Sequence, residues 1–319
     1  MFKALVLVRN LESSAVSLDF GEFTIKLVGI RFQELRDIFS SADVNPDDWI
    51  FEKSYTLLPL GAPGSPVGGI PTDIEDILLL LRLHRAGDIS FIKQTIIPPS
   101  GNKLVQFPCR AINDLNSYSS LRFKFESEEC EEWKAFSIRI RNGQSWNSDW
   151  FAAARRFFLS GGAKPFNPAR DDVDRIVDYA TALESALVPE KDYNTRRISR
   201  RAAALLPSVD PTDHEVIVGF IKKLCEIRSR IVHGNGMNDE TRAWLFTNSE
   251  VVESRVREIL AAAVQQLPPG EEKRRAALAQ FYNPTDDDRG NFIVEKFREI
   301  KNAGVRKAVA AEIALLARR

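Results

Sequence analysis

Cysteine and histidine are both scarce in this chain of 319 residues, with three of each. The cysteines, Cys109, Cys130 and Cys225, are widely spaced and form no CxxC pair, which argues against a structural zinc site and a disulfide framework. The few histidines leave few candidates for acid–base chemistry near neutral pH. We therefore expect neither a metal nor a cofactor.

Net charge is absent too, because 44 Lys and Arg residues balance 44 Asp and Glu residues. Such a chain has no global positive field, so a polyanion would have to bind a local basic patch. Long apolar runs are also missing: the run at 77–81 is far shorter than the ~20 residues of a membrane span. The apolar start up to Val8 is too short for a secretory signal. These absences predict a soluble, cytoplasmic protein without membrane contacts.

What is present is an ordinary globular composition, 44% hydrophobic and 28% charged, over a length that suits about two domains. The stretches 3–8, 22–28 and 121–125 alternate or run apolar over strand lengths. One helix interrupts this region after a capping box formed by Thr72 and Glu75. We predict a β-rich mixed domain over residues 1–126.

From about residue 127 the apolar period changes to that of helices. Ser148 is the expected N-cap of the first helix, Gly161 and Gly162 its expected end, and Thr212 with Glu215 a second capping box. Helices are expected over 148–160, 171–187, 194–206, 212–233 and 249–267. The predicted fold class is therefore α+β, with an all-α helical bundle at 127–270 and a helical extension at 271–319.

His233 is the histidine whose context suggests chemistry. His84 and His214 fit a helix end and a helix start, where dipole and surface contacts explain them. Arg228 precedes His233 by an R-x4-H spacing, which places the two side chains about 140° apart on a regular helix. They converge on one ligand only if the helix distorts near Gly234 or if a second subunit contributes.

The segment 228–234 resembles the HEPN superfamily (higher eukaryotes and prokaryotes nucleotide-binding), in particular its ApeA-like branch. That branch pairs an Arg-Ser-x-Ile-Val-His-Gly segment with an upstream "ALE" helix and an arginine- and alanine-rich helix. Here these are 182–184 and 200–206, in the same order, and the resemblance covers about residues 145–267. It implies a helical bundle that usually dimerises and, in active members, a metal-independent RNA endonuclease.

The resemblance assigns Arg228 and His233 as the catalytic pair, with Ser229 beside the arginine. Arg230, three residues before His233, is a second arginine that could replace or assist Arg228, although the family frame favours Arg228. Attack by an RNA 2′-hydroxyl needs proton transfer near neutral pH, which imidazole supplies. It also needs a positive charge beside the developing phosphorane, which guanidinium supplies. The structural alternative is a surface arginine paired to a carboxylate and a histidine that caps the helix end.

Glu184 lies on or beside the apolar stripe of its helix. A carboxylate in that position is costly unless it is paired. The expected partner is Arg200, Arg201 or Arg228, and a direct catalytic role is the alternative interpretation.

A basic cluster precedes the end of the arginine-rich helix. Its members are Arg196, Arg197, Arg200 and Arg201. The functional hypothesis is a groove that binds the RNA backbone, and the structural one is a solvated helix face.

Three functions stay open at this point. The first is a HEPN-type ribonuclease, a toxin or antiviral-defence effector whose N-terminal domain senses a trigger, acting as a homodimer. The second is a non-catalytic HEPN module that binds nucleotide, RNA or a protein partner through the same groove. The third is a structural module for homo-oligomerisation without a ligand.

Overall fold

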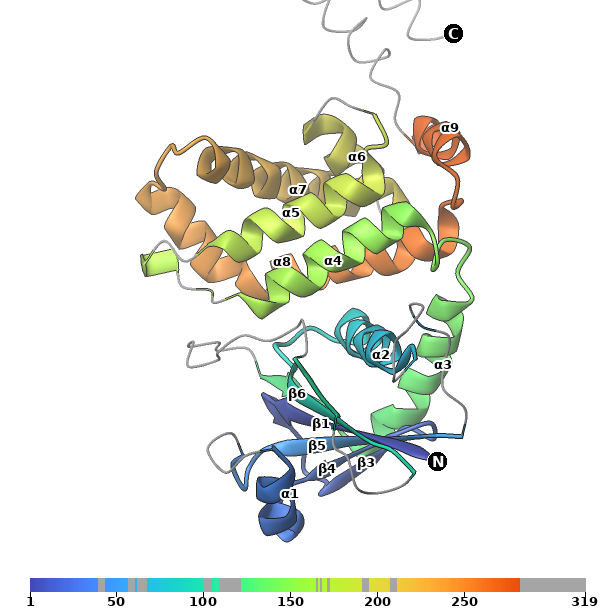
Figure 1. Ribbon diagram of the computed structural model, residues 1–319. Coiled ribbons are helices and arrows are strands. Elements are labelled where there is room, and N and C mark those ends of the chain that lie inside the picture. The colour runs from blue at the N-terminus through green and yellow to red at the C-terminus, as the bar shows by residue number, and fades with distance from the viewer. Residues whose placement is uncertain are drawn as a thin grey trace, which may run out of the picture.

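The computed structural model describes residues 1–281 with internal gaps at 40–43, 57–60, 62–67, 100–104, 109–121, 165, 167, 171–172, 191–194 and 207–210. An antiparallel sheet with flanking helices is followed by a helical region, so the predicted α+β class is confirmed (Figure 1). Within this described part, no helix is long and apolar enough to cross a membrane.

Six antiparallel strands form the main sheet, in the order β3-β4-β5-β1-β6-β7. Their bounds are Phe2–Arg9 (β1), Ser17–Asp19 (β3), Thr24–Leu27 (β4), Trp49–Tyr55 (β5), Ser90–Ile97 (β6) and Val105–Pro108 (β7). A separate parallel pair joins β2 (Leu11–Glu12) to β8 (Phe123–Lys124). The strands predicted at 3–8 and 22–28 are confirmed, whereas the one at 121–125 is reduced to β8.

The central strand β1 faces a core on each side, because successive side chains of a strand point to opposite faces. Leu5 and Leu7 face a small core under α1 (Phe32–Phe39), a helix that the sequence pattern did not predict. The alternating residues Ala4, Val6 and Val8 face the main core, over which α2 (Ile70–His84) lies (Figure 1). Burial on both faces explains the continuous apolar run of this strand.

Helix α2 lies between the sheet and the helical bundle (Figure 1). Every residue from Ile77 to Leu83 is buried as a result. The predicted capping box at Thr72 is wrong, because the helix already begins at Ile70 and its N-cap, Gly69, makes no side-chain bond. Pro71 sits in the first turn, where its missing N–H costs nothing.

The helical region consists of α3 (Cys130–Arg141), α4 (Asp149–Ala163), α5 (Asp174–Leu187), α6 (Thr195–Leu205), α7 (Pro211–Val232), α8 (Asp239–Gln266) and α9 (Glu271–Phe281). One continuous hydrophobic core runs from the sheet through α2 into these helices. Helix α3 packs on the sheet side, since the Trp133 ring meets Phe20 and Phe23 at 5.0 and 5.3 Å. The boundary at 126/127 stays a prediction.

The sequence predicts the start of α4 correctly and its end wrongly. Ser148 is confirmed as the N-cap of α4, since its Oγ accepts a hydrogen bond from the Phe151 N–H at 3.3 Å. The predicted end at Gly161 and Gly162 is wrong, because the helix continues through both. The predicted start at 171 lies outside the described residues.

The two helices that follow α6 also begin earlier than predicted. Helix α7 starts at Pro211, so Thr212 lies within the first turn and not at an N-cap. Helix α8 starts at Asp239 and not at Ser249, with Asn238 as its N-cap through a 2.9 Å bond from the Thr241 N–H. A polar cap of this kind leaves no trace in apolar periodicity.

Two buried arginines satisfy the carbonyl end of α5, where helix carbonyls lack partners within the helix. Arg201 donates to the Leu187 carbonyl at 2.8 Å and to both carboxylate oxygens of Glu190 at 2.8 Å. Arg274 of α9 donates to the Ser185 carbonyl at 2.8 Å. These contacts attach α6 and α9 to the end of α5.

Candidate active site

The C-terminal end of α7 carries the predicted catalytic pair and keeps regular helical hydrogen bonds up to His233. The His233 N–H donates to the Ser229 carbonyl at 3.1 Å, and the Asn235 N–H reaches back to the Arg230 carbonyl at 3.0 Å. Gly234 has a φ of +69°, which glycine adopts without strain,. This Schellman arrangement stops the helix after His233. Of the two ways to bring the pair together, distortion of the helix is therefore excluded within one chain.

Arg228 is tied to the neighbouring helix α5. Its Nη2 donates to Oε2 of Glu184 at 3.3 Å, and the two side chains are only 21% and 28% exposed. Burial raises the pKa of Glu184, and the charge of Arg228 opposes that shift. Among the three predicted partners of Glu184, the structure selects Arg228, which holds the guanidinium at the α5–α7 junction.

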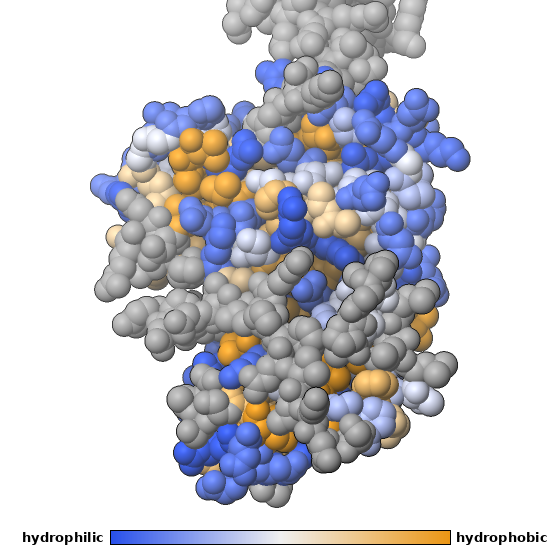
Figure 2. Space-filling model, viewed as in Figure 1, coloured by the Kyte–Doolittle hydropathy of each residue, from blue (hydrophilic) through white to orange (hydrophobic). Residues whose placement is uncertain are grey.

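The other residues of the predicted site lie nearer to solvent. His233 and Arg230 are exposed, and Ser229 is half-buried. Val232, next to His233 in the chain, is 52% exposed, and Phe246, seven residues after Asp239 at the start of α8, is 79% exposed. Figure 2 shows hydrophobic residues gathered at this end of the bundle, where α7 passes into α8, beside hydrophilic ones.

The arginines of α6 do not share one environment. Arg196 is exposed and Arg197 half-buried, whereas Arg200 pairs with Glu215 of α7. Arg201 is 1% exposed and lies inside the bundle. The inclusion of Arg201 in an RNA-binding groove is therefore wrong, because a buried guanidinium that is tied to Glu190 and to the end of α5 cannot meet a phosphate at the surface.

A second cluster of charged groups, which the sequence analysis missed, lies buried between α2 and the bundle. Arg175 Nη1 stands 3.0 Å from Asp88 Oδ1, and Arg82 Nη2 stands 3.7 Å from it. The Tyr179 hydroxyl donates to Glu253 Oε2 at 2.8 Å. Burial raises the pKa of Asp88 to about 6 although Arg175 acts to lower it. We call these five residues the junction cluster.

The junction cluster balances two guanidinium groups with two carboxylates, which is typical of a structural ion-pair network. Its members come from the end of α2, the following loop, α5 and α8, so it joins the sheet domain to the bundle. The available signal was a charged residue within an apolar stretch, as at Arg82 among leucines. Sequence alone could not pair it with Asp88 and Arg175.

His84 and His214 carry no comparable site. The His84 ring packs against Phe125 and Phe136 at 5.9 and 5.1 Å, and burial lowers its pKa. His214 lies beside Glu215 near the start of α7. Among the described residues, no group of three or more His, Cys, Asp or Glu side chains could hold a metal ion.

No family model matches this chain, and neither a curated protein nor a solved structure matches it. The HEPN resemblance therefore rests on the three motifs and their order alone.

Proposed function

We propose that this protein is a metal-independent endoribonuclease of the HEPN type, with Arg228 and His233 as its catalytic residues. The observation that carries the proposal is the end of α7 itself. There a guanidinium, held by Glu184, lies five residues before a solvent-exposed imidazole on the same helix. A toxin or antiviral-defence effector in the cytoplasm is the biological role that fits this activity.

The chemistry needs a general base, a general acid and a positive charge at the phosphorus. The RNA O2′ attacks the adjacent phosphorus, the P–O5′ bond breaks, and the products are a 2′,3′-cyclic phosphate and a 5′-hydroxyl. An imidazole accepts the proton of the 2′-hydroxyl, and a second proton donor protonates the leaving O5′. Arg228 stabilises the additional negative charge of the phosphorane.

A homodimer completes the site in this proposal. Because α7 stays regular through His233, the side chains at 228 and 233 leave the helix about 140° apart. A second copy packed on the exposed Val232 and Phe246 would bring its own imidazole to the guanidinium. Two imidazoles would then serve as base and acid.

The test is incubation of the full chain with mixed RNAs in EDTA. Wild type should cleave, and His233→Ala should lose ~10²–10⁴-fold in rate, as expected for a proton-transfer group. His214→Ala, at the opposite end of α7, is the matched control and should cleave as wild type. Arg228→Lys keeps the charge but not the planar fork, and should lose activity without unfolding.

Two further readouts define the chemistry. A 2′-deoxy substitution at the scissile nucleotide should block cleavage, and products should end in 2′,3′-cyclic phosphate. If wild type leaves all RNAs intact, or if His233→Ala cuts at the wild-type rate, the ribonuclease proposal is wrong. RNA binding without cleavage would support the non-catalytic module in its place.

A further inference from the structure

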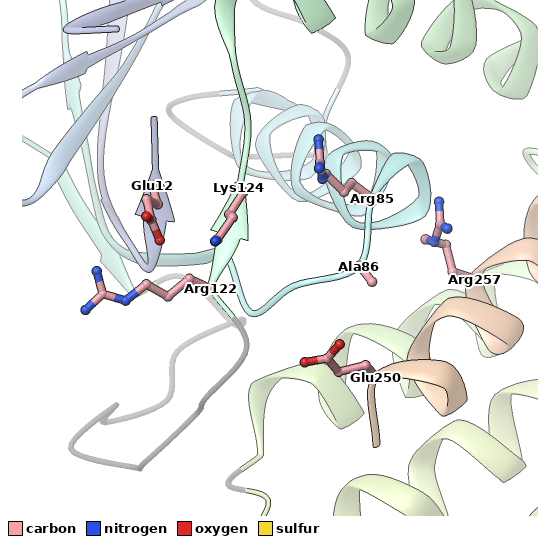
Figure 3. Close-up of a pocket in the computed structure, with 7 residues that line it drawn as sticks. All are labelled: Glu12, Arg85, Ala86, Arg122, Lys124, Glu250 and Arg257. Atoms are coloured by element: carbon pink, nitrogen blue, oxygen red, sulfur yellow. The ribbon is translucent and has the colours of Figure 1, made fainter. Parts of the chain in front are cut away.

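A cavity of about 580 Å³ opens where the β2–β8 pair meets the loop after α2 and the middle of α8 (Figure 3). It lies outside the predicted ribonuclease site, and none of its residues belongs to that site. Its charged lining consists of Arg85, Arg122, Lys124, Arg257, Glu12 and Glu250. Two of the four cations already pair with carboxylates outside this lining, Arg85 with Glu129 and Arg257 with Glu258 at 3.6 Å, which leaves Arg122 and Lys124 as the cations available to a ligand.

Two of the cations lie at β8, Lys124 within the strand and Arg122 directly before it. Arg122 and Lys124 flank Phe123, which is fully buried, so the alternation of a strand directs both charged side chains to the opposite face,. Within the part of the chain that the structure describes, neither forms an ion pair. Glu12 is the register partner of Lys124 in the β2–β8 ladder.

The loop after α2 closes against β8 through a glycine. Gly87 has a φ of +141°, and a Cβ on it would stand 2.7 Å from the Phe123 Cα. Its N–H donates to Glu253 Oε1 of α8 at 3.0 Å. This close approach of Gly87 to β8 fixes the position of the loop that carries Arg85. Asp88, the residue after Gly87, belongs to the junction cluster.

Arg257 is held in place on the α8 side. Its Nη1 donates to the Leu83 carbonyl at 3.3 Å and to the His84 carbonyl, at the C-terminal end of α2. A fixed guanidinium loses little freedom when it binds an anion. Arg85, on the same side of the cavity as Arg257 (Figure 3), pairs with Glu129 outside the cavity.

We propose that this cavity binds a nucleotide. Its volume is in the range of small-molecule sites, about 300–1,000 Å³. Its cations suit phosphate groups, which guanidinium binds through charge-assisted, bidentate hydrogen bonds. Glu12 and Glu250 repel a bare polyphosphate but accept hydrogen bonds from ribose hydroxyls or base amino groups, so the mixed lining favours a nucleotide over phosphate alone.

The position of the cavity suggests where such a ligand would act. Its walls come from both the sheet domain and α8, and Glu250, Glu253 and Arg257 share one face of α8. A nucleotide bound there would contact both parts of the chain at their junction. This proposal stands independently of the ribonuclease proposal, because the two sites share no residue.

The experiment is calorimetric titration of the full chain in EDTA with three probes: ATP, pyrophosphate and adenosine. ATP should bind at one site per chain, pyrophosphate more weakly and adenosine not at all. The double variant Arg122→Ala with Lys124→Ala should weaken ATP binding about tenfold or more, because two charge-assisted contacts are lost. Both side chains are exposed, so a thermal melt should show an intact fold.

Matched controls separate the cavity from general charge and from the ribonuclease site. Arg156→Ala with Lys273→Ala removes two exposed cations elsewhere and should leave ATP affinity within about twofold,. His233→Ala should bind ATP as wild type does, whether or not it cleaves RNA. The proposal is overturned if wild type does not bind ATP up to about 1 mM, or if the control pair weakens ATP binding as much as the Arg122 and Lys124 pair does. It is also overturned if His233→Ala loses ATP binding, or if the cavity binds 5′-phosphorylated RNA in place of ATP.

Discussion

Gly162 of α4 lies directly against the guanidinium of Arg82 in α2: a Cβ built on Gly162 would stand 1.7 Å from Arg82 Nη2. Arg82 has little room to retreat, since it is 2% exposed and its Nη1 donates to the Leu159 carbonyl at 3.2 Å. A glycine inside a helix, costly in itself, therefore has a packing reason here.

The first prediction compares two helical glycines. Gly162→Ala should destabilise the fold by ~3 kcal/mol or more, because it displaces a buried arginine from Asp88. Gly219→Ala in α7, where nothing lies within 4 Å of the added Cβ, should stabilise it by ~0.5–1 kcal/mol. Urea denaturation measures both. Equal effects at the two positions would contradict the packing argument.

The second prediction concerns Glu184 and Arg228. Because burial raises the pKa of Glu184 despite Arg228, Glu184→Gln should change the free energy of unfolding at pH 7 by less than ~1 kcal/mol. Arg228→Ala should cost ~1–3 kcal/mol, since a half-buried carboxylate loses its partner. The double variant Arg228→Ala with Glu184→Gln should recover much of that loss. A double-mutant cycle without coupling would show that the pair has no role in stability.

The third prediction is a pH dependence centred on Asp88. Its pKa in the folded chain is about 6, above the ~3.9 of an unfolded chain. Between these values the folded state binds more protons than the unfolded state, so stability falls as the pH rises. Wild type should thus lose up to ~3 kcal/mol relative to Asp88→Asn between about pH 4 and pH 7. If wild type instead gained stability relative to Asp88→Asn as the pH rose, Arg175 and Arg82 would be keeping Asp88 ionised.

The fourth prediction is dimerisation through the exposed end of α7 and α8. Light scattering at micromolar concentration should give twice the chain mass of 36.0 kDa. Phe246→Glu should return the protein to a monomer, because it places a charge in an apolar interface. Val16→Glu, at a position 64% exposed beside the sheet, is the control and should stay dimeric. A monomeric wild type would remove the composite site from the ribonuclease proposal.

The local sequence pattern was sufficient to predict those elements whose structure depends mainly on their own residues. The run at 3–8 predicts β1 because both faces of that strand are buried, and Ser148 predicts its cap because the bond spans three residues. The requirement that Glu184 have an arginine partner also follows from its place in an apolar stripe. The order of a sheet region followed by helices could be predicted for the same reason.

Tertiary structure decided which distant groups meet. Glu184 pairs with Arg228 and not with Arg200 or Arg201 only because of how α5 and α7 pack. Helix packing likewise buries Arg201 against the end of α5 and places Asp88 beside Arg175 at the domain junction. Periodicity shows only that a charge lies on an apolar face and does not identify its partner, because charge compensation acts through space. The fate of these side chains therefore depends on how the helices pack.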